Sequence, residues 1–410
     1  MKSGTRGFTG RVWVRRPGVW SAGSALIITA ILCVSGVDRS VAATGMPVAG
    51  VAGSVNRTVP KVTPPSKELR FSAAPTDAEF LRTGLFEEPL APVSATAARE
   101  NRDLAHALLD YRDAVRKSGG NDAVQPILAF LATHPDSPWK PALQLDLGIV
   151  YRQTGHFSRA LEVWQTGWNE TRQLRDPEGR ALANAIVARL SQLDAYLGRK
   201  EVLQPLLDSI HDRPVGGAVA QLITDSHTGL YEMLHKPEDS FRCGPLALKR
   251  ILNYSGGASP VALQVLDEAH STPDGLSLSA VQGVATKAGM DYQMAFRTPG
   301  AAIVTPAVAH WKVGHYAAIV GRVDNRYLVQ DTTFGEDIHV SRTTLDEEGS
   351  GYFLVPAGAL PEGWRSVSAE EGSKVWGRGN TSITTMPLRR RPRPRHTAAV
   401  ARRRLWSRRR

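Results

Sequence analysis

Apolar side chains recur at helical spacing over a long stretch that begins near residue 97. In "ENRDLAHALLDYRDAV" one helical face carries Leu104, Ala107, Leu108, Tyr111 and Val115. Intervals of three and four residues are typical of an amphipathic helix that covers a core with one face. A second apolar stretch, "DAVQPILAFLATH", continues the pattern until "HPDSP" interrupts it. The pattern therefore predicts consecutive helices that pack on one another.

The next stretch, "LGIVYRQTGHFSRALEVW", resembles a tetratricopeptide repeat, a helix–turn–helix unit that stacks on its neighbours. The packing positions of that repeat are filled by Leu147, Gly148, Tyr151, Gly155, Ala160 and Trp164. A weaker copy, "LSQLDAYLGRKEVLQPLL", places Gly198 where the first copy has Gly155. We expect residues 97–212 to form an all-α, TPR-like domain, whose surface is a candidate binding site for a protein partner.

The period of the pattern changes beyond about Gln221, after a Pro/Gly break at "RPVGG". Short helices are predicted by "CGPLALKRILNYSGG", "SPVALQVLDEAH" and "SLSAVQGVATKAGM". Strands follow in "DYQMAFR", "HYAAIVGRV", "RYLVQD" and "GYFLVP", and the turn residues Asp324 and Asn325 predict a hairpin between the second and the third. Helices followed by antiparallel strands indicate an α+β fold for residues 220–356. We expect the helical domain to fold independently of this one.

The N-terminus has the features of an export signal. Basic residues precede an apolar run from Val19 to Val37, and the small residues of "SVAA" follow it. These features predict a signal peptide or a membrane anchor over residues 1–43, with cleavage as the favoured outcome. We therefore expect export from a bacterial cytoplasm to a periplasmic, extracellular or membrane-anchored location. Residues 44–96 are rich in Ala, Pro, Thr, Val and Ser and are expected to be a disordered linker.

The charge of the chain is concentrated at its C-terminal end. The formal net charge of the 410 residues is +11, and the segment from Pro387 to Arg410 holds 11 Arg and no acidic residue. Because a sequence so highly charged cannot bury a core, residues 357–410 are expected to be a disordered, Arg-rich tail. The tail and an uncleaved N-terminal segment are candidate membrane contacts. The alternatives for the tail are nonspecific nucleic-acid contact or no selected role, and no specific nucleic-acid partner is expected.

Cys243 is the only cysteine that remains once the signal segment, which contains Cys33, is removed. It lies at the predicted start of a helix, where backbone N–H groups and the helix dipole favour the thiolate, the nucleophilic form of cysteine. Arg242 adds positive charge beside the thiol, and Gly244 leaves room for a substrate carbonyl. The alternative is that Cys243 is a small, buried apolar residue.

A thiol nucleophile needs a base and a group that orients the base. His315 starts a predicted strand and Asp331 ends the next one, while His310, in "AHWKVGH", is a rival base. A strict two-residue turn would set Asp331 opposite Ala318, which faces away from His315 because strand side chains alternate. A Cys–His–Asp site therefore requires a three-residue turn, a bulge, or an Asp331 that has already left the strand ladder.

These motifs resemble those of peptidase family C39, the double-glycine peptidases that trim leader peptides from exported bacteriocins. The resemblance covers residues from about 237 to 356 and rests on "RCGPLALKRIL", "GLSLSAVQGVATKAGM" and "PAVAHWKVGHYAAIVGRVDNRYLVQDTTFGE". It extends to the C39-like segment near the start of some large bacterial proteins with YD/RHS repeats. It implies a papain-like fold, with Cys243 as nucleophile, His315 as general base and acid, and Asp331 as the group that orients His315.

Three positions differ from the usual C39 pattern. Pro237 stands where the family has a Gln that donates to the oxyanion, Arg242 where it has Asp, and Thr332 where it has Pro. Ser240 is the candidate replacement for the oxyanion donor. The chain contains no G-x-x-x-x-G-K-[ST] stretch, the signature of a transport ATPase.

Three functions remain open at this point. The first is an exported thiol peptidase that cleaves a peptide or protein substrate through Cys243, His315 and Asp331. The second is a catalytically weak or inactive C39-like domain that binds peptides. The third is a thiol amidase or acyltransferase acting on cell-wall peptides. Neither a cofactor nor a metal is expected, because no Cys/His pair has the spacing of metal ligands.

Overall fold

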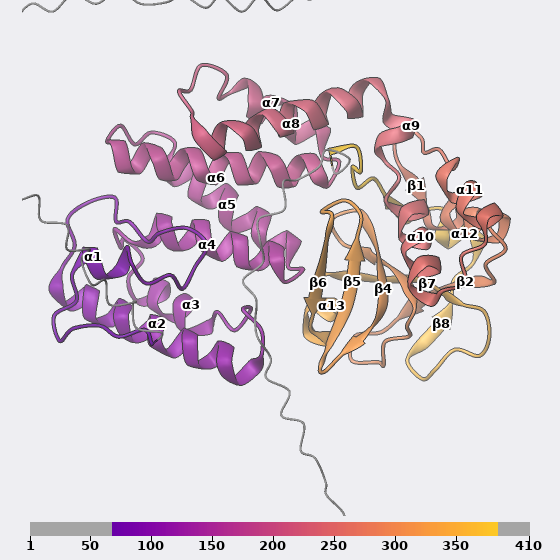
Figure 1. Ribbon diagram of the computed structural model, residues 1–410, viewed down its shortest axis with the longest axis horizontal. Helices are drawn as coiled ribbons and strands as arrows, with labels where there is room; N and C mark the ends of the chain where they lie inside the picture. Colours follow the sequence, from indigo (N-terminus) through magenta and orange to yellow (C-terminus); the bar gives the residue numbers. More distant parts are fainter. Residues whose placement is uncertain (1–67, 384–410) are drawn as a thin grey trace, which may run out of the picture. The chain divides into compact units, whose positions relative to one another are not determined.

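A computed structural model describes residues 68–383 of the chain. Helices fill the part up to His235, and helices with antiparallel strands fill the rest (Figure 1). The expected fold class, a mostly helical region followed by an α+β region, is therefore confirmed. The signal peptide or anchor expected at residues 1–43 and the Arg-rich end lie outside the described residues. Between residues 68 and 383, no helix combines the length and the hydropathy that are needed to cross a bilayer.

The helical region consists of consecutive helices that pack on their neighbours. They are α2 (Ala98–Ser118), α3 (Gln125–Thr133), α4 (Lys140–Gln153), α5 (Phe157–Thr171), α6 (Pro177–Tyr196), α7 (Lys200–Asp208) and α8 (Gly217–His235). The indole of Trp164, on α5, is fully buried against α4 and donates a hydrogen bond to the Leu145 carbonyl at 3.0 Å. A Cβ atom at Gly148 would overlap that indole. The packing roles expected of Gly148 and Trp164 are thus confirmed, whereas the tetratricopeptide class stays a prediction.

Part of the expected linker is ordered. Residues 68–96 include the short helix α1 (Asp77–Phe80) and bury Phe80 and Leu90 in the core of the helical region. The Phe80 ring lies 4.7 Å from the Trp139 ring, measured between centroids. The expectation of a disordered linker is wrong for this part. A few large apolar side chains that pack in the core are enough to order the segment, although its average composition is typical of a linker.

The α+β region is built on a seven-stranded antiparallel sheet. Its strands are β2 (Tyr292–Arg297), β3 (Ala307–Trp311), β4 (His315–Val323), β5 (Arg326–Asp331), β6 (Glu336–Val340), β7 (Gly349–Pro356) and β8 (Trp364–Ser366), in the order β6-β5-β4-β3-β7-β2-β8. A second sheet pairs β1 (Leu276–Ser277) with β9 (Trp376–Gly377). The helices are α9 (Pro237–Ser240), α10 (Cys243–Ser255), α11 (Pro260–Asp267), α12 (Leu278–Lys287), α13 (Arg342–Glu348) and α14 (Ala369–Gly372). α10 packs on β4 and α12 packs on β2.

A β-bulge sets the register of the β4–β5 hairpin. The turn has two residues, but the register shifts between Ile319 and Gly321. Beyond the shift, Ala318 pairs with the residue that precedes Asp331, so Asp331 comes to the face of the sheet that carries His315. One of the three solutions expected from the sequence, the bulge, is therefore the one that the chain adopts.

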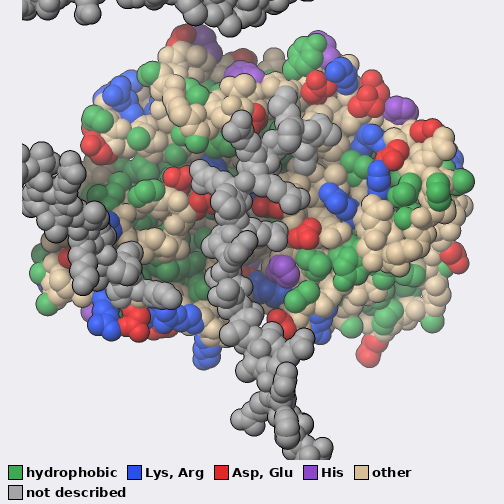
Figure 2. Space-filling model, viewed as in Figure 1, with side chains coloured by type: hydrophobic (Ala, Val, Ile, Leu, Met, Phe, Trp, Pro, Cys, Tyr) green, Lys and Arg blue, Asp and Glu red, His purple; other side chains and the backbone are tan. Residues whose placement is uncertain are grey.

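Residues 357–383 are ordered, in contrast to the disordered tail expected from residue 357 onward. β8 extends the main sheet by pairing with β2, and β9 pairs with β1. Val367 and Val375 are buried in the same apolar cluster as Cys243. The expectation failed because the Arg residues are concentrated beyond Pro387, while the sequence before it carries enough apolar side chains to pack. On the face drawn in Figure 2, acidic and basic side chains of the described residues are interspersed.

The helical and α+β regions share one apolar core. The turn between α4 and α5 lies against the sheet, where the Gly155 carbonyl accepts a hydrogen bond from the Trp311 indole at 3.3 Å. Phe157, the first residue of α5, is fully buried with its ring centroid 6.0 Å from that of Trp311 and 4.9 Å from that of Phe334. The helical region therefore completes the core of the sheet and is not merely tethered to it.

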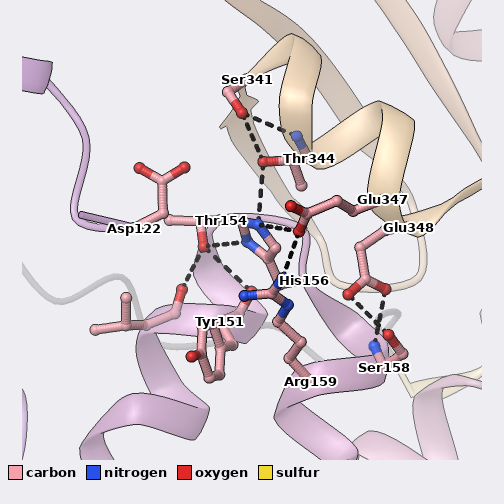
Figure 3. Close-up of polar contacts among 12 residues, drawn as sticks. Asp122, Tyr151, Thr154, His156, Ser158, Arg159, Ser341, Thr344, Glu347 and Glu348 are labelled. Carbon is pink, nitrogen blue, oxygen red and sulfur yellow. Dashed lines mark hydrogen bonds and ion pairs between the residues drawn. The ribbon is translucent and has the colours of Figure 1, made fainter. Parts of the chain in front are cut away.

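Polar groups at the same contact are matched across it (Figure 3). The buried Glu348 carboxylate, at the end of α13, accepts hydrogen bonds from the backbone N–H and the hydroxyl of Ser158 at 3.0 and 2.8 Å. The first bond satisfies an N–H group at the start of α5, where a negative charge is favourable. The two nitrogens of the His156 ring meet the hydroxyls of Thr154 and Thr344 at 3.1 and 3.3 Å.

Candidate active site

His315 and Asp331 form a buried hydrogen bond between neighbouring strands. Nε2 of His315 lies 2.7 Å from Oδ2 of Asp331, and the side chains are 0% and 1% exposed. The other carboxylate oxygen accepts a hydrogen bond from the Thr333 backbone N–H at 2.9 Å. Burial alone lowers the pKa of His315, but the Asp331 carboxylate outweighs burial and, together with the Cys243 thiol, raises that pKa above its usual range.

Cys243 is the first residue of α10 and is 2% exposed. Leu248 and Ile251 of the same helix are buried, and they fix α10 against β4. Cβ of Cys243 and Nδ1 of His315 both lie beside Gly379, so the thiol is close to the side of the ring that Asp331 leaves free. The structure thus brings together Cys243, His315 and Asp331, the three residues that the resemblance to C39 peptidases implied.

The three side chains have complementary chemistry. A protonated imidazole beside a thiol at a helix N-terminus stabilises the thiolate, which is the nucleophilic form. The carboxylate fixes the orientation of the imidazole and keeps it protonated. The same imidazole can then donate its proton to a leaving group and later accept one from water. Within residues 68–383, no group of three or more His, Cys, Asp or Glu side chains is arranged to hold a metal ion.

Three neighbours of the cysteine differ from their expected roles. The Ser240 hydroxyl donates to the Lys236 carbonyl at 2.9 Å, so its one proton does not point at an oxyanion. The Arg242 guanidinium donates to carbonyls at the end of α11, including that of Leu266 at 3.1 Å, and so caps that helix. A Cβ atom at Gly244 would overlap the Val281 side chain, so this glycine serves helix packing and not substrate access.

His310, the rival base, is bound to other partners. Its Nδ1 lies 2.8 Å from the Ser350 hydroxyl, and its Nε2 lies 2.8 Å from the Trp376 carbonyl. Burial lowers the pKa of His310 to about 4, although the hydrogen bond to Trp376 acts in the opposite direction. The geometry therefore favours His315 over His310 as the candidate base, in agreement with the role that the resemblance implied for His315.

Three aromatic rings surround the His315 ring, and none of them was singled out from the sequence. Phe334 and Trp311 belong to the α+β region, with ring centroids 5.9 and 6.5 Å from that of His315. Phe157 comes from the helical region and meets the ring edge-on at 6.4 Å. No local sequence signal marks Phe157 as a site residue, because it reaches the site only through the packing of the two regions.

Residues 234–359 match the family model of the peptidase C39 family. This part of the chain is a C39-like domain. Its boundaries agree with the stretch whose motifs resemble that family. A solved double-glycine motif protease from an AMS/PCAT transporter, in complex with its leader peptide, is similar at 20% sequence identity. The similarity covers 28% of this chain and 84% of that one, with a TM-score of 0.24. A search of curated proteins finds no match.

Proposed function

We propose that the chain is a thiol peptidase that hydrolyses peptide bonds through Cys243, His315 and Asp331. One observation carries the proposal, namely the buried 2.7 Å bond between His315 and Asp331 beside a cysteine that starts α10. The match of residues 234–359 to the C39 family supports the same class of reaction.

The proposed reaction has two steps. The Cys243 thiolate attacks the carbonyl carbon of the peptide bond, and the His315 imidazolium donates its proton to the leaving amine, which gives a thioester. Water then gives a proton to His315 and its hydroxyl attacks the thioester, which releases the carboxylic acid and regenerates the thiolate and the imidazolium. The backbone N–H of Cys243, at the start of α10, is the proposed oxyanion donor, since the Ser240 hydroxyl is bound to Lys236.

Hydrolysis of a defined peptide mixture, followed by mass spectrometry, tests the proposal. We expect the full chain to give cleavage products that disappear in Cys243→Ala and in His315→Ala. The matched control is His339→Ala, which changes an exposed histidine on the same sheet. Products that persist in Cys243→Ala, or their absence both from the unchanged chain and from a chain that ends at Val375, would contradict a Cys243 peptidase.

A non-catalytic peptide-binding domain is the second candidate function, and a specific observation favours it. Pro237 replaces the usual oxyanion Gln, and the Ser240 hydroxyl does not take its place. Binding of peptides without turnover, unchanged in Cys243→Ala, would select this function. If the chain converts cell-wall peptides but leaves all ordinary peptides uncleaved, the third function, a thiol amidase or acyltransferase, is selected instead.

A further inference from the structure

A segment of the chain itself lies in the catalytic site. Trp376–Thr381, named here the strap, follows Val375, and Figure 1 shows it in yellow near the ends of α6 and α8. Gly379 of the strap is buried, and a Cβ atom at this position would overlap Nδ1 of His315 and lie 3.1 Å from Cβ of Cys243. The strap therefore fills the space that a substrate has to enter to reach the thiol.

On the side of the α+β region, the strap is bound as an extended peptide. Its first two residues are β9, which pairs with β1. The Arg378 N–H donates to the carbonyl of Gly314, the residue before His315, at 2.9 Å. The Trp376 carbonyl lies 2.8 Å from Nε2 of His310. Addition of a strand through main-chain hydrogen bonds is a common way in which proteins bind peptide ligands.

The surface that contacts the strap restricts which residues can stand at three of its positions. A Cβ atom at Gly377 would overlap the Tyr316 ring, and one at Gly379 would overlap His315, so both positions need the smallest residue. Between them, the Arg378 guanidinium makes two hydrogen bonds of 2.9 Å to the Glu201 carboxylate. A two-pronged bond of this kind suits the planar guanidinium and is not reproduced by other side chains.

The helical region supplies the opposite wall of the cleft. Glu201 belongs to α7, and the Asn380 N–H donates to the Tyr196 carbonyl at the end of α6 at 2.7 Å. A Cβ atom at Gly198 would overlap the Arg378 carbonyl. Among the described residues, no strap carbonyl accepts a hydrogen bond from the Cys243 N–H. The strap is thus held as a ligand and is not poised for attack by the thiol.

We propose that the strap is an intramolecular peptide ligand that closes the catalytic cleft, and that Glu201 reads the arginine of the peptide bound there. Peptides that displace the strap then have a small–basic–small sequence like that of Gly377, Arg378 and Gly379. The claim that the strap inhibits the protein rests on the proposed peptidase function. The claim that the strap occupies the cleft does not.

Access to Cys243 tests the closure without any need for catalysis. In a full chain with Cys33→Ser, Cys243 is the only thiol, and its alkylation by a maleimide reports whether the cleft is open. Gly379→Ala forces the strap away from His315, so we expect the alkylation rate to rise by about tenfold or more. The matched control is Gly257→Ala, a change into open space that should leave the rate unchanged.

A pair of truncations tests the same closure without altering the residues around His315. A chain that ends at Val375 lacks the strap and should react as fast as Gly379→Ala, while a chain that ends at Ile383 keeps the strap and should react like the full chain. Equal rates in all of these chains would overturn the proposal. An open cleft in the chain that ends at Val375, without peptidase activity in that chain, would leave this proposal standing and remove the proposed function.

The role of Glu201 is tested with a free peptide that has the sequence of residues 374–383. Added to the chain that ends at Val375, the peptide should slow alkylation of Cys243, and a peptide with Ala in place of Arg should protect the thiol about two- to fivefold less well, as expected for a partly exposed ion pair. The difference between the peptides should vanish in Glu201→Gln. Equal protection by both peptides with Glu201 present would show that Glu201 does not read the arginine.

Discussion

Two buried histidines on neighbouring strands respond to their surroundings in opposite directions. Burial lowers the pKa of His315, but the Asp331 carboxylate outweighs this effect and raises it. His310 meets the Ser350 hydroxyl and the Trp376 carbonyl instead, and burial lowers its pKa to about 4. At neutral pH His315 therefore carries a proton and His310 does not. A general acid must hold a proton, so this difference supports the role proposed for His315.

Asp331→Asn removes the charge that keeps His315 protonated. Burial then prevails and the pKa of His315 falls, so at pH 6 the thiolate loses its cationic partner. In the chain that ends at Val375, we expect the alkylation rate of Cys243 at pH 6 to fall by about tenfold, the effect of one pKa unit. The exposed Asp337→Asn, on the same sheet, is the control. An identical pH profile in Asp331→Asn would show that Asp331 does not hold the proton on His315.

The same substitution should change stability with a defined sign. Because the pKa of His315 is raised in the folded chain, its protonation stabilises the fold fully below the unfolded value of about 6.5. That contribution is lost as pH rises through the folded value. We therefore expect the difference in Tm between the unchanged chain and Asp331→Asn to be largest near pH 6 and to narrow as pH rises. A difference that widens with pH would contradict the assignment.

Residue type and position identified the three catalytic candidates but not the roles of their neighbours. Cys243, His315 and Asp331 could be selected because each lies at the end of a predicted element and has reactive chemistry. Whether the Ser240 hydroxyl is free depends on the short turn of α9, where it bonds to a backbone carbonyl. Whether Gly244 faces a substrate depends on the distance to α12. The first property follows from a local turn that the sequence pattern did not predict, and the second from a contact between segments far apart in sequence.

At the scale of elements, α4 carries a buried carboxyl group that the sequence pattern does not explain. Asp146 is 1% exposed, and its Oδ1 accepts a hydrogen bond from the Glu88 N–H at 3.1 Å, while its Oδ2 has no partner. Burial raises the pKa of Asp146 to about 8. The folded chain therefore keeps a proton that the unfolded chain releases above about pH 4, so stability falls as pH rises from about 4 to about 8.

Asp146→Asn should remove this pH dependence. The amide resembles the neutral acid in shape, and its oxygen can keep the bond to the Glu88 N–H. We expect Tm at pH 7 to rise above that of the unchanged chain, and the decline of Tm between pH 5 and pH 8 to become shallower. The exposed Asp208→Asn on α7 should change neither. A Tm that falls in Asp146→Asn at every pH would show that the group is ionised when folded.

The positions of helices and strands could be predicted where the periodicity of a single segment determines them. They could not be predicted where they depend on the pairing of two segments. Helical and strand periodicity located α2, α10, β4 and β5 and the hairpin turn. The sequence left three solutions open, and a bulge was one of them. Only the pairing of β4 with β5 shows which solution the chain adopts. The ordering of β9 was missed because a two-residue strand has no period, and its stability comes from pairing with β1.

At the scale of the whole molecule, the two regions predicted as separate domains are joined at the candidate active site. The boundary between them was expected at the change of period near Gln221, but α8 continues the helical region to His235 and packs on α6 and α7. The periodicity does not show that Phe157 enters the core of the sheet or that α6 and α7 line the cleft. The helical region then has a defined role, because it covers His315 on one side and binds the strap on the other.

Phe157→Ala tests whether this joint core is a single cooperative unit. The side chain is fully buried between rings of the α+β region, with Phe334 at 4.9 Å and Trp311 at 6.0 Å, so its removal leaves a cavity shared by both regions. We expect a loss of about 3–5 kcal/mol in the free energy of unfolding, the usual cost of truncating a buried Phe. Hydrogen exchange should show protection falling together in α5 and in β4, because neither region can fill the cavity alone.

The exposed Tyr231→Ala on α8 removes a ring of similar size and should leave both the stability and the protection unchanged. Loss of protection confined to α4–α6, with β4 and β5 unaffected, would show instead that the helical region folds independently and that the site does not depend on it.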